Sequence, residues 1–387
     1  MARSDPPRLL FYFLHLLGVG HVYRAKRLIE GFSRHDIAVD IVYGGERIGE
    51  TFAAQSVFYL PPIRAEDATY KITLDDNGTP ITTDYMNRRK SLLLDHFATL
   101  TPDMILTEAF PFGRRVVRHE LTALIEAAKS RAKPPLIVSS VRDILQEHRK
   151  PGRADETLHL LQTGFDHVLV HSDPEIIRID ETFSPAPLFA DIFNYTGFVV
   201  PDDRVTGEIP TYDVIVSAGG GGFGVSLLTT AIEASNHYPQ LSWCLTTGPH
   251  MNMSDIQNLR QNLPPNVTIV KRLDNLAGHM QKAKISISQC GYNTAMDVLR
   301  AHNNSDCRAI FVPYDIQGQS EQLRRAGLLA NAGFAINLPQ SQLSCSKLIT
   351  AINQARLLPN VDHHVDMAGV ENTARIVRKW LDDHRAK

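Results

Sequence analysis

The amino-acid sequence predicts an α/β protein of two parallel-sheet domains, and three observations lead to this prediction. Strand-like runs of apolar and β-branched residues alternate with helix-like segments along most of the chain. This alternation stops near residue 200 and restarts near residue 213. The chain has 387 residues, which is too long for one ordinary hydrophobic core. Strands that alternate with helices favour parallel sheets covered by helices on both faces.

The first domain is assigned to residues 1–200. Its strands are expected at 9–14, 37–43, 104–107, 136–139 and 168–170, and its helices at 22–33, 116–129 and 156–162. Residues 60–84 break this pattern, with a hairpin turn expected at 75–78. The apolar run at 9–14 follows two arginines and superficially resembles a signal peptide. Because His15 interrupts the run and an amphipathic helix follows, a buried first strand explains it better.

A linker at residues 201–212, which holds prolines, glycines and charges, leads into a second domain at 213–366. Strands are expected there at 213–217, 241–246, 267–270, 285–288, 309–312 and 335–336, and helices at 225–235, 276–283, 293–299, 317–331 and 345–355. The last segment, 367–387, is expected to contain a helix that packs back across the domain junction, because Ile376, Val377 and Trp380 share one face.

Composition and charge exclude several classes of protein. The chain is 43% hydrophobic and 21% charged, with a formal net charge of −2, so nothing favours binding to nucleic acid. Its four cysteines form no C-x-x-C pair, which argues against a zinc knuckle or a disulfide scaffold and fits a reducing cytoplasm. No H-E-x-x-H, D-x-D or G-x-S-x-G motif occurs, and His363-His364 is interpreted as part of a solvated loop; we therefore expect no metal site.

Polar side chains follow the predicted strands of the first domain. The carboxyl ends of parallel strands line the ligand crevice of an open α/β sheet. The residues expected at this edge are titratable or charged: His21, Glu108, Arg114, Arg142, Asp143, His171 and Asp173.

The first glycine loop, Gly18-Val19-Gly20-His21, lacks the third glycine of a dinucleotide fingerprint, because Tyr23 stands at that position. A tight turn that brings backbone close to a ligand remains. Histidine is a base near neutral pH, so His21 at the helix start is a catalytic candidate. Its alternative is a capping or packing residue.

The second glycine loop holds Gly219, Gly220, Gly221 and Gly222 directly after a strand. Consecutive glycines carry an entropic cost that makes sense where backbone must approach a phosphate or a reacting sugar. No G-K-[ST] follows, so this is not a P-loop, and a flexible connection is the alternative.

A third motif, ISISQCGYNTAMDVL at residues 285–299, reads as a strand, a glycine turn and a helix that starts at Asn293 or Thr294. Unsatisfied N–H groups at such a helix start favour an anion. Asp297, one turn further on, is placed to accept hydrogen bonds from a sugar hydroxyl. The alternative is an ordinary βα turn with an Asn cap.

The G-x-G-H loop, the second glycine loop and the segments SQCGYNTAMDVL and FVPYDIQGQSEQLRRAGLLANAG together resemble the GT-B glycosyltransferases of family 28. The segments TEAFPFGRR, SVRDIL and VHSDP point to a less characterised bacterial branch. The resemblance implies a GT-B fold, which has two Rossmann-like domains facing across a cleft. It also implies an inverting, metal-independent transfer of a hexose or N-acetylhexosamine from a nucleotide-sugar, UDP-linked in the family, to an acceptor hydroxyl, with no cofactor.

The resemblance also assigns site residues. Backbone near Leu273 would contact the base, and Asp297 stands where the family has a ribose-binding glutamate. Gly291, Asn293 and Thr294 would cradle the diphosphate, helped by the loops of Gly18, Gly20 and Gly219 to Gly222. Glu321 and Gln322 stand where the family has two glutamines for the donor sugar. His21 or Glu108 would be the base.

On the acceptor side, residues 108–115 replace the glycine loop that the family uses for its lipid acceptor. The candidates for acceptor binding are Arg114, Arg142 and Asp143. Residues 60–84 are expected to form a wall of the acceptor side. The expected partners are a nucleotide-sugar and a small or lipid-linked acceptor, in the cytoplasm and, for a lipid-linked acceptor, at the inner membrane face. Two rivals remain: a UDP-sugar hydrolase or epimerase of related fold, and a non-catalytic sugar-nucleotide binder.

Overall fold

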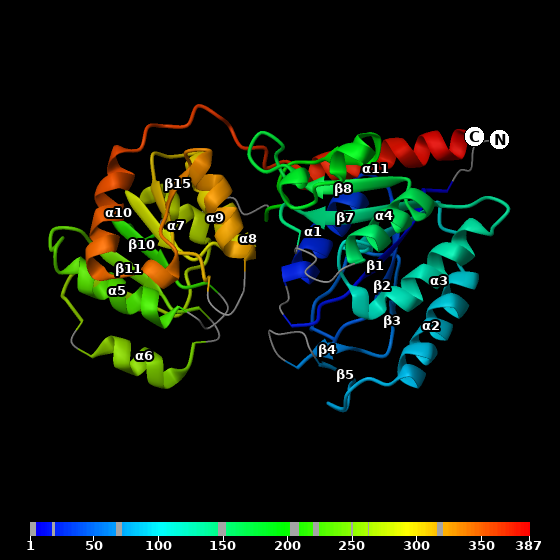
Figure 1. The fold of residues 1–387 in the computed structure, drawn as a ribbon, viewed down its shortest axis with the longest axis horizontal. Helices are drawn as coiled ribbons and strands as arrows, with labels where there is room; N and C mark the ends of the chain where they lie inside the picture. The colour runs from blue at the N-terminus through cyan, green and yellow to red at the C-terminus, as the bar shows by residue number, and fades with distance from the viewer. Residues whose placement is uncertain are drawn as a thin grey trace. The chain divides into compact units, whose positions relative to one another are not determined.

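The computed structural model describes residues 5–17, 20–66, 72–145, 152–201, 209–219, 224–248, 251–261, 263–315 and 320–387. The chain divides into two compact units (Figure 1). The first unit combines Met1–Pro201 with Asp366–Lys387, and the second is Asp202–Val365. Each unit is built on a parallel sheet, which confirms the predicted α/β class.

The first unit has a sheet of strand order β3-β2-β1-β6-β7-β8-β9, in which all neighbours are parallel. Its strands are β1 (Arg8–Phe13), β2 (Ala38–Tyr43), β3 (Ser56–Tyr59), β6 (Met104–Glu108), β7 (Leu136–Arg142), β8 (His167–His171) and β9 (Phe193–Tyr195). A small antiparallel pair, β4 (Arg64–Ala65) with β5 (Thr73–Leu74), lies within the segment that lacked a pattern. The strand order reverses between β1 and β6, where ligands bind in sheets of this kind.

Helices cover both faces of this sheet. One face packs on α1 (Gly20–Arg34) and α11 (Gly369–Ala386), and the other on α2 (Thr83–Ala98), α3 (Arg118–Lys129) and α4 (Arg153–Gly164). Short 3₁₀ turns η1 (Arg115–Val117), η2 (Ile179–Glu181) and η3 (Ala186–Ile192) complete the unit. Helix α2 escapes prediction because its buried stripe is narrow: Arg89, Leu93 and Phe97, with a charged residue at one of the three positions.

A buried polar cluster explains that arginine. Arg89 and Glu120 are fully buried, and two guanidinium nitrogens of Arg89 donate to the Glu120 carboxylate at 3.0 and 2.8 Å. The Tyr12 hydroxyl donates to the same carboxylate. A third nitrogen of Arg89 donates to the carbonyls of Gly44 and Pro61. The cluster therefore ties α2, α3 and β1 to the loop after β2.

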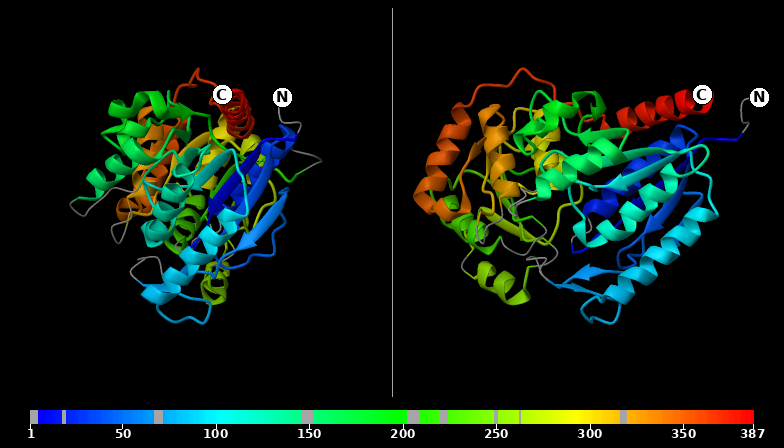
Figure 2. Two further views of the ribbon diagram at one scale, coloured as in Figure 1. Left: turned by 90° about the vertical axis from the view of Figure 1, so that its right-hand side faces the viewer. Right: turned by 45° about the vertical axis from the view of Figure 1, so that its right-hand side comes forward.

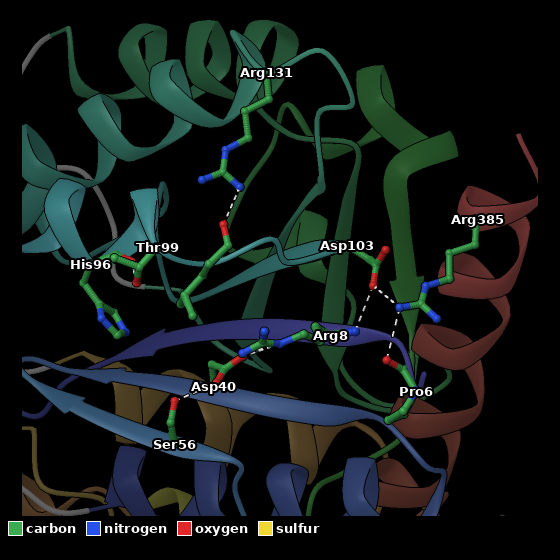
Figure 3. Close-up of polar contacts among 10 residues, drawn as sticks. Pro6, Arg8, Asp40, Ser56, His96, Thr99, Asp103, Arg131 and Arg385 are labelled. Atoms are coloured by element: carbon green, nitrogen blue, oxygen red, sulfur yellow. Dashed lines mark hydrogen bonds and ion pairs between the residues drawn. The ribbon is translucent and has the colours of Figure 1, made fainter. Parts of the chain in front are cut away.

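The strand-start edge of the sheet is held by carboxylates, as Figure 3 shows. Asp103 Oδ2 accepts from the Arg8 backbone N–H at 2.9 Å and from Arg385 Nη2 at 2.7 Å. Asp40 accepts from the Arg8 guanidinium at 2.7 Å and from the Ser56 hydroxyl at 2.6 Å. The end of α11, red in Figure 2, is thereby fixed beside the first strand of the chain. The opposite, carboxyl-end edge carries the site residues.

The second unit repeats the architecture with strand order β12-β11-β10-β13-β14-β15. Its strands are β10 (Val214–Ser217), β11 (Trp243–Thr246), β12 (Val267–Val270), β13 (Ile285–Ser288), β14 (Arg308–Phe311) and β15 (Ala335–Asn337). Its helices are α5 (Val225–Ser235), α6 (Met253–Arg260), α7 (Leu276–Lys282), α8 (Tyr292–His302), α9 (Glu321–Asn331) and α10 (Cys345–Leu357), with the 3₁₀ turn η4 (Gln340–Gln342). The order reverses between β10 and β13, so this pair of strand ends is the second expected ligand position.

Breaking the Arg89 cluster should destabilise the first unit. In Glu120→Ala the buried guanidinium of Arg89 loses its carboxylate, and we expect a loss of about 3–5 kcal/mol in the free energy of unfolding. Urea unfolding followed by circular dichroism measures it. Glu126→Ala, at an exposed position of the same helix, is the matched control. A loss no larger than that of the control would contradict a stabilising role for the cluster.

Candidate active site

His21 and Glu108 meet at the carboxyl ends of β1 and β6, where the strand order of the first unit reverses. His21 is the second residue of α1, and Glu108 is the last residue of β6. The imidazole Nδ1 lies 2.6 Å from Glu108 Oε1. Because an ionised carboxylate only accepts hydrogen bonds, Nδ1 carries the hydrogen and Nε2 keeps its lone pair. The side chain of His21 remains 22% exposed, so a substrate hydroxyl can reach it.

Two arginines bind the same carboxylate. Arg24, one helical turn after His21, donates from Nη2 to Glu108 Oε1. Arg114 donates from Nε and Nη2 to Glu108 Oε2 at 3.2 and 3.1 Å. Glu108 itself is only 2% exposed. Sequence reasoning missed Arg24, although its position three residues after His21 puts the two side chains on one face of the helix.

Charge and burial set the protonation states of this cluster. Burial is the largest influence on His21, and together with the nearby positive charges of Arg114 and Arg142 it lowers the pKa of the imidazole to about 3, against the opposing effect of Glu108. Burial by itself disfavours ionised Glu108, but His21, Arg114 and Arg24 outweigh it and hold the pKa of this carboxyl well below its usual range. The pair is therefore a neutral imidazole beside a carboxylate at neutral pH.

The next strand ends add a histidine that is fully buried. His171, at the end of β8, lies with Nε2 2.7 Å from Ser140 Oγ and Nδ1 2.9 Å from Thr196 Oγ1. Burial lowers the pKa of His171 to about 3. Asp173 accepts backbone N–H groups of Glu175 and Asp366, each at 3.0 Å. Both residues therefore stabilise the segments that follow β8 and β9.

The acceptor-side candidates differ in accessibility. Arg114 is bound to Glu108, and its side chain is 10% exposed. Arg142 is partly exposed and acts electrostatically on His21. Asp143 is fully buried and so has no surface open to a ligand. Gly20 begins α1, whereas Gly18 lies outside the described residues.

In the second unit, the turn after β13 leads directly into α8. The helix begins at Tyr292, one residue before the expected start, with Gly291 as its N-cap. Gly291 has no side chain that could cap this end, and the N–H groups of a helix start favour an anion. A Cβ atom built on Gly291 would meet nothing within 4 Å, which shows that the turn is approachable. Asn293 is exposed, and Thr294 and Asp297 are partly buried.

Gly219 lies two residues after the end of β10 and has a φ of +70°, a conformation that favours glycine. A Cβ atom there would lie 3.2 Å from Gln289 Oε1. The strand ends of β10 and β13 therefore bring Gly219 and Gln289 together, and Gln289 is a residue that sequence reasoning left unassigned. Gly220, Gly221 and Gly222 lie outside the described residues.

The start of α9 is tied to the same turn by Arg325. This arginine is fully buried; its Nη1 donates to the Cys290 carbonyl at 3.0 Å and its Nη2 to Glu321 Oε1 at 2.9 Å. Gln322 Oε1 accepts from the Tyr314 backbone N–H at 3.2 Å. Glu321 and Gln322 thus lie at one strand-end edge but have protein partners. Leu273 is partly exposed between β12 and α7.

The described residues contain no group of three or more His, Cys, Asp or Glu side chains placed to hold a metal ion. Among their helices none is long and apolar enough to cross a membrane.

Comparison with known proteins first defines the fold. The chain resembles the solved structure of a calicheamicin glycosyltransferase, with a TM-score of 0.65 and 15% identity over 99% of each chain. It also resembles a UDP-GlcNAc 2-epimerase from Neisseria meningitidis bound to UDP-GlcNAc, with a TM-score of 0.59 and 13% identity over 97% of this chain and 100% of that one. The fold is therefore GT-B, as predicted.

Sequence comparison then shows what the second half of the chain is similar to. Residues 218–372 match the glycosyltransferase family 28 C-terminal domain. A UDP-N-acetylglucosamine–N-acetylmuramyl-(pentapeptide) pyrophosphoryl-undecaprenol N-acetylglucosamine transferase from Thermotoga maritima is 27% identical over 147 residues, which is 38% of this chain and 41% of that relative. The part of the chain that its motifs indicated, most of the second unit, is thus similar to the family 28 C-terminal domain, and the chain spans less than half the length of the curated relatives it matches.

The buried, neutral His171 predicts a pH-dependent stability. In the unfolded chain a histidine binds a proton below about pH 6.5, whereas folded His171 does not until about pH 3, so stability falls as the pH drops below 6.5. From pH 7 to pH 5 this loss is about 2 kcal/mol for one such histidine.

We expect His171→Asn to reduce the wild-type loss of unfolding free energy between pH 7 and pH 5 by that amount. Urea unfolding at the two pH values measures it, and His159→Asn, at an exposed position of α4, is the control. An unchanged pH dependence in His171→Asn would contradict a neutral buried imidazole.

Proposed function

We propose that this protein is an inverting glycosyltransferase that moves a hexose or N-acetylhexosamine from a UDP-sugar to an acceptor hydroxyl. The observation that carries the proposal is the His21–Glu108 pair at the strand-order reversal of the first unit. The pair offers an unprotonated and accessible imidazole nitrogen in the first unit. In the same chain, residues 218–372 match the family 28 C-terminal domain, which is the proposed donor domain. A pure binding protein has no need for such a base.

In the proposed reaction His21 Nε2 takes the proton of the acceptor hydroxyl. The oxygen of that hydroxyl attacks the anomeric carbon opposite the leaving UDP, and the C–O bond to the diphosphate breaks with its electron pair. Glu108 accepts the hydrogen bond from Nδ1 and so holds the tautomer in which Nε2 carries the lone pair. Attack from the opposite side inverts the anomeric configuration.

The leaving diphosphate is proposed to bind at the start of α8. The N–H groups and the helix dipole at Gly291, Asn293 and Thr294 would stabilise its charge, with backbone around Gly219 nearby in the sheet order. This arrangement would take the place of a metal ion, and no cofactor is proposed. Asp297 would bind the ribose and backbone near Leu273 the base.

For the sugar itself, Gln322 and Glu321 remain the proposed contacts, with one carboxylate oxygen of Glu321 already bound to Arg325. The Thermotoga relative's name specifies UDP-N-acetylglucosamine as its donor, which makes this the first donor to test. That name also specifies an undecaprenol-linked acceptor. A lipid-linked sugar, met at the inner membrane face with Arg142 nearby, is therefore the first acceptor class to test here.

The epimerase likeness supports one alternative, a hydrolase or epimerase that acts on the same nucleotide-sugar. Steady UDP release from UDP-N-acetylglucosamine without any acceptor would favour it, whereas acceptor-dependent release supports transfer. Calorimetry with UDP, GDP and dTDP establishes the nucleotide beforehand.

Removing either member of the pair should abolish transfer. We expect His21→Ala and Glu108→Ala to lower kcat by about 100-fold or more, because a general base contributes that much, while UDP affinity stays unchanged. Acceptor-dependent UDP release and calorimetry measure the two effects, and His119→Ala, at an exposed position of α3, is the control. Full activity in both variants would exclude the assignment.

Asp297 tests the donor site separately. Asp297→Ala should weaken UDP binding about tenfold through loss of the ribose hydrogen bonds, whereas Asp297→Glu should keep it within about threefold. Calorimetry with UDP measures both, beside Asp306→Ala, an exposed aspartate after α8. Equal UDP affinity in Asp297→Ala and the control would remove this residue from the site.

A further inference from the structure

Within the first unit, the Glu108 carboxylate has more donors than a catalytic dyad requires. An imidazole and two guanidinium groups surround it, so both oxygens are engaged: His21 and Arg24 on Oε1, Arg114 on Oε2. Glu108 is only 2% exposed, so these contacts form in a buried position. A neutral imidazole donates one hydrogen bond but no positive charge, so the two arginines supply the charge that compensates this carboxylate.

We propose that Arg24 and Arg114 are positioning residues that hold Glu108 against Nδ1 of His21 and keep His21 in its neutral form, ready to act as a base. Only the expected change in kcat rests on the proposed function. The expected change in the titration of His21 can be measured on the protein without any substrate.

The charge balance supports this role. If Glu108 faced His21 alone, the favourable partner of the carboxylate would be an imidazolium, and His21 would take up a proton at mildly acidic pH. Two guanidinium groups, which remain charged at every relevant pH, already compensate the single negative charge. A proton on His21 would then add a third positive charge to a buried site. The arginines therefore remove the reason for His21 to be protonated.

The backbone supports the same role for Arg114. Arg114 has a φ of +58° and Ala109 a φ of +63°, both in the left-handed region. Such a residue other than glycine costs about 1 kcal/mol or more and persists only where its surroundings impose it. The Gly113 N–H donates to the Ala109 carbonyl at 2.7 Å, which folds the segment back on itself. This turn returns the guanidinium of Arg114 to the carboxylate six residues earlier.

The other charged or titratable groups around His21 are consistent with this balance. They come from each neighbouring strand end: Arg24 on α1, Glu108 on β6, Arg114 after β6, Arg142 on β7 and neutral His171 on β8. Since Arg142 also lowers the pKa of His21, it adds to the effect of the two arginines.

The test follows the His21 ring by NMR, through the ¹³Cε1–¹Hε1 signal assigned with His21→Gln, between pH 7.5 and pH 4.5 without substrate. In wild type the signal should not titrate in this range. In Arg114→Met the guanidinium charge is lost, and the titration midpoint should rise by about two pH units, from about 3 into the observed range. Arg114→Lys, which keeps the charge, should stay closer to wild type, and Arg24→Met should repeat the shift.

The matched control is Arg118→Met, a nearby arginine whose partner is Glu156 instead of Glu108. Its His21 signal should equal that of wild type. If Arg114→Met and Arg24→Met left the signal as flat as in the control, the positioning role would be overturned. Should Arg114→Met fail to fold, Arg114→Lys and Arg24→Met decide by the same signal.

The kinetic measurement separates this proposal from the proposed function. With UDP-N-acetylglucosamine and an acceptor, Arg114→Met should lower kcat about tenfold, leave the donor KM within about twofold, and move the acid limb of the kcat/KM profile upward with the NMR midpoint. A shifted NMR midpoint in a protein that shows no transfer would support the positioning role and count against the transferase.

Discussion

The structure of the first unit depends on a buried carboxylate at the end of a central strand. Glu108 would be costly at that position if it were unpaired, because an ion loses its hydration there. Its donors come from α1 and from the turn after β6, so pairing this one charge also fixes where α1 begins and how that turn runs. The same pairing uses Nδ1 of His21 and leaves Nε2 without a partner in the described structure. The contacts that stabilise the buried Glu108 carboxylate are therefore also the contacts that keep His21 available as a base.

The second unit uses the same strand-order reversal with different chemistry. At β10 and β13 the neighbouring groups are backbone and neutral side chains, such as Gly219, Gln289 and the start of α8. The buried cation Arg325 donates to the Cys290 carbonyl of that turn. Fixed amide dipoles suit a diphosphate, which is already fully charged, whereas a titratable pair suits an acceptor hydroxyl that must lose a proton. This difference fits a division of labour between donor and acceptor.

The carboxyl-end edge of the first sheet can carry titratable residues because interactions elsewhere stabilise the remainder of the unit. In the first unit, Asp40 and Asp103 secure the strand-start edge and the end of α11, and the Arg89–Glu120 pair joins two helices to β1 and the loop after β2. These contacts lie among buried or half-buried groups, where one lost partner leaves an uncompensated charge. They leave the carboxyl-end edge for residues that can change charge or meet a ligand.

The sequence by itself determined the alternation of strands and helices and the candidates His21 and Glu108, because hydrophobic periodicity and strand-end position are local properties of the chain. The GT-B class followed from the resemblance of its motifs to a known family. The sequence did not reveal α2, whose buried stripe includes Arg89, nor the roles of Arg24, Gln289 and Arg325. Arg24 and Glu108 are 84 positions apart, and only the placement of β6 beside β1 brings them together. Likewise, the link from Arg325 to Cys290 spans 35 positions and needs α9 to lie beside the turn after β13. Pairing of charges over such separations depends on sheet order, which the tertiary structure alone decides.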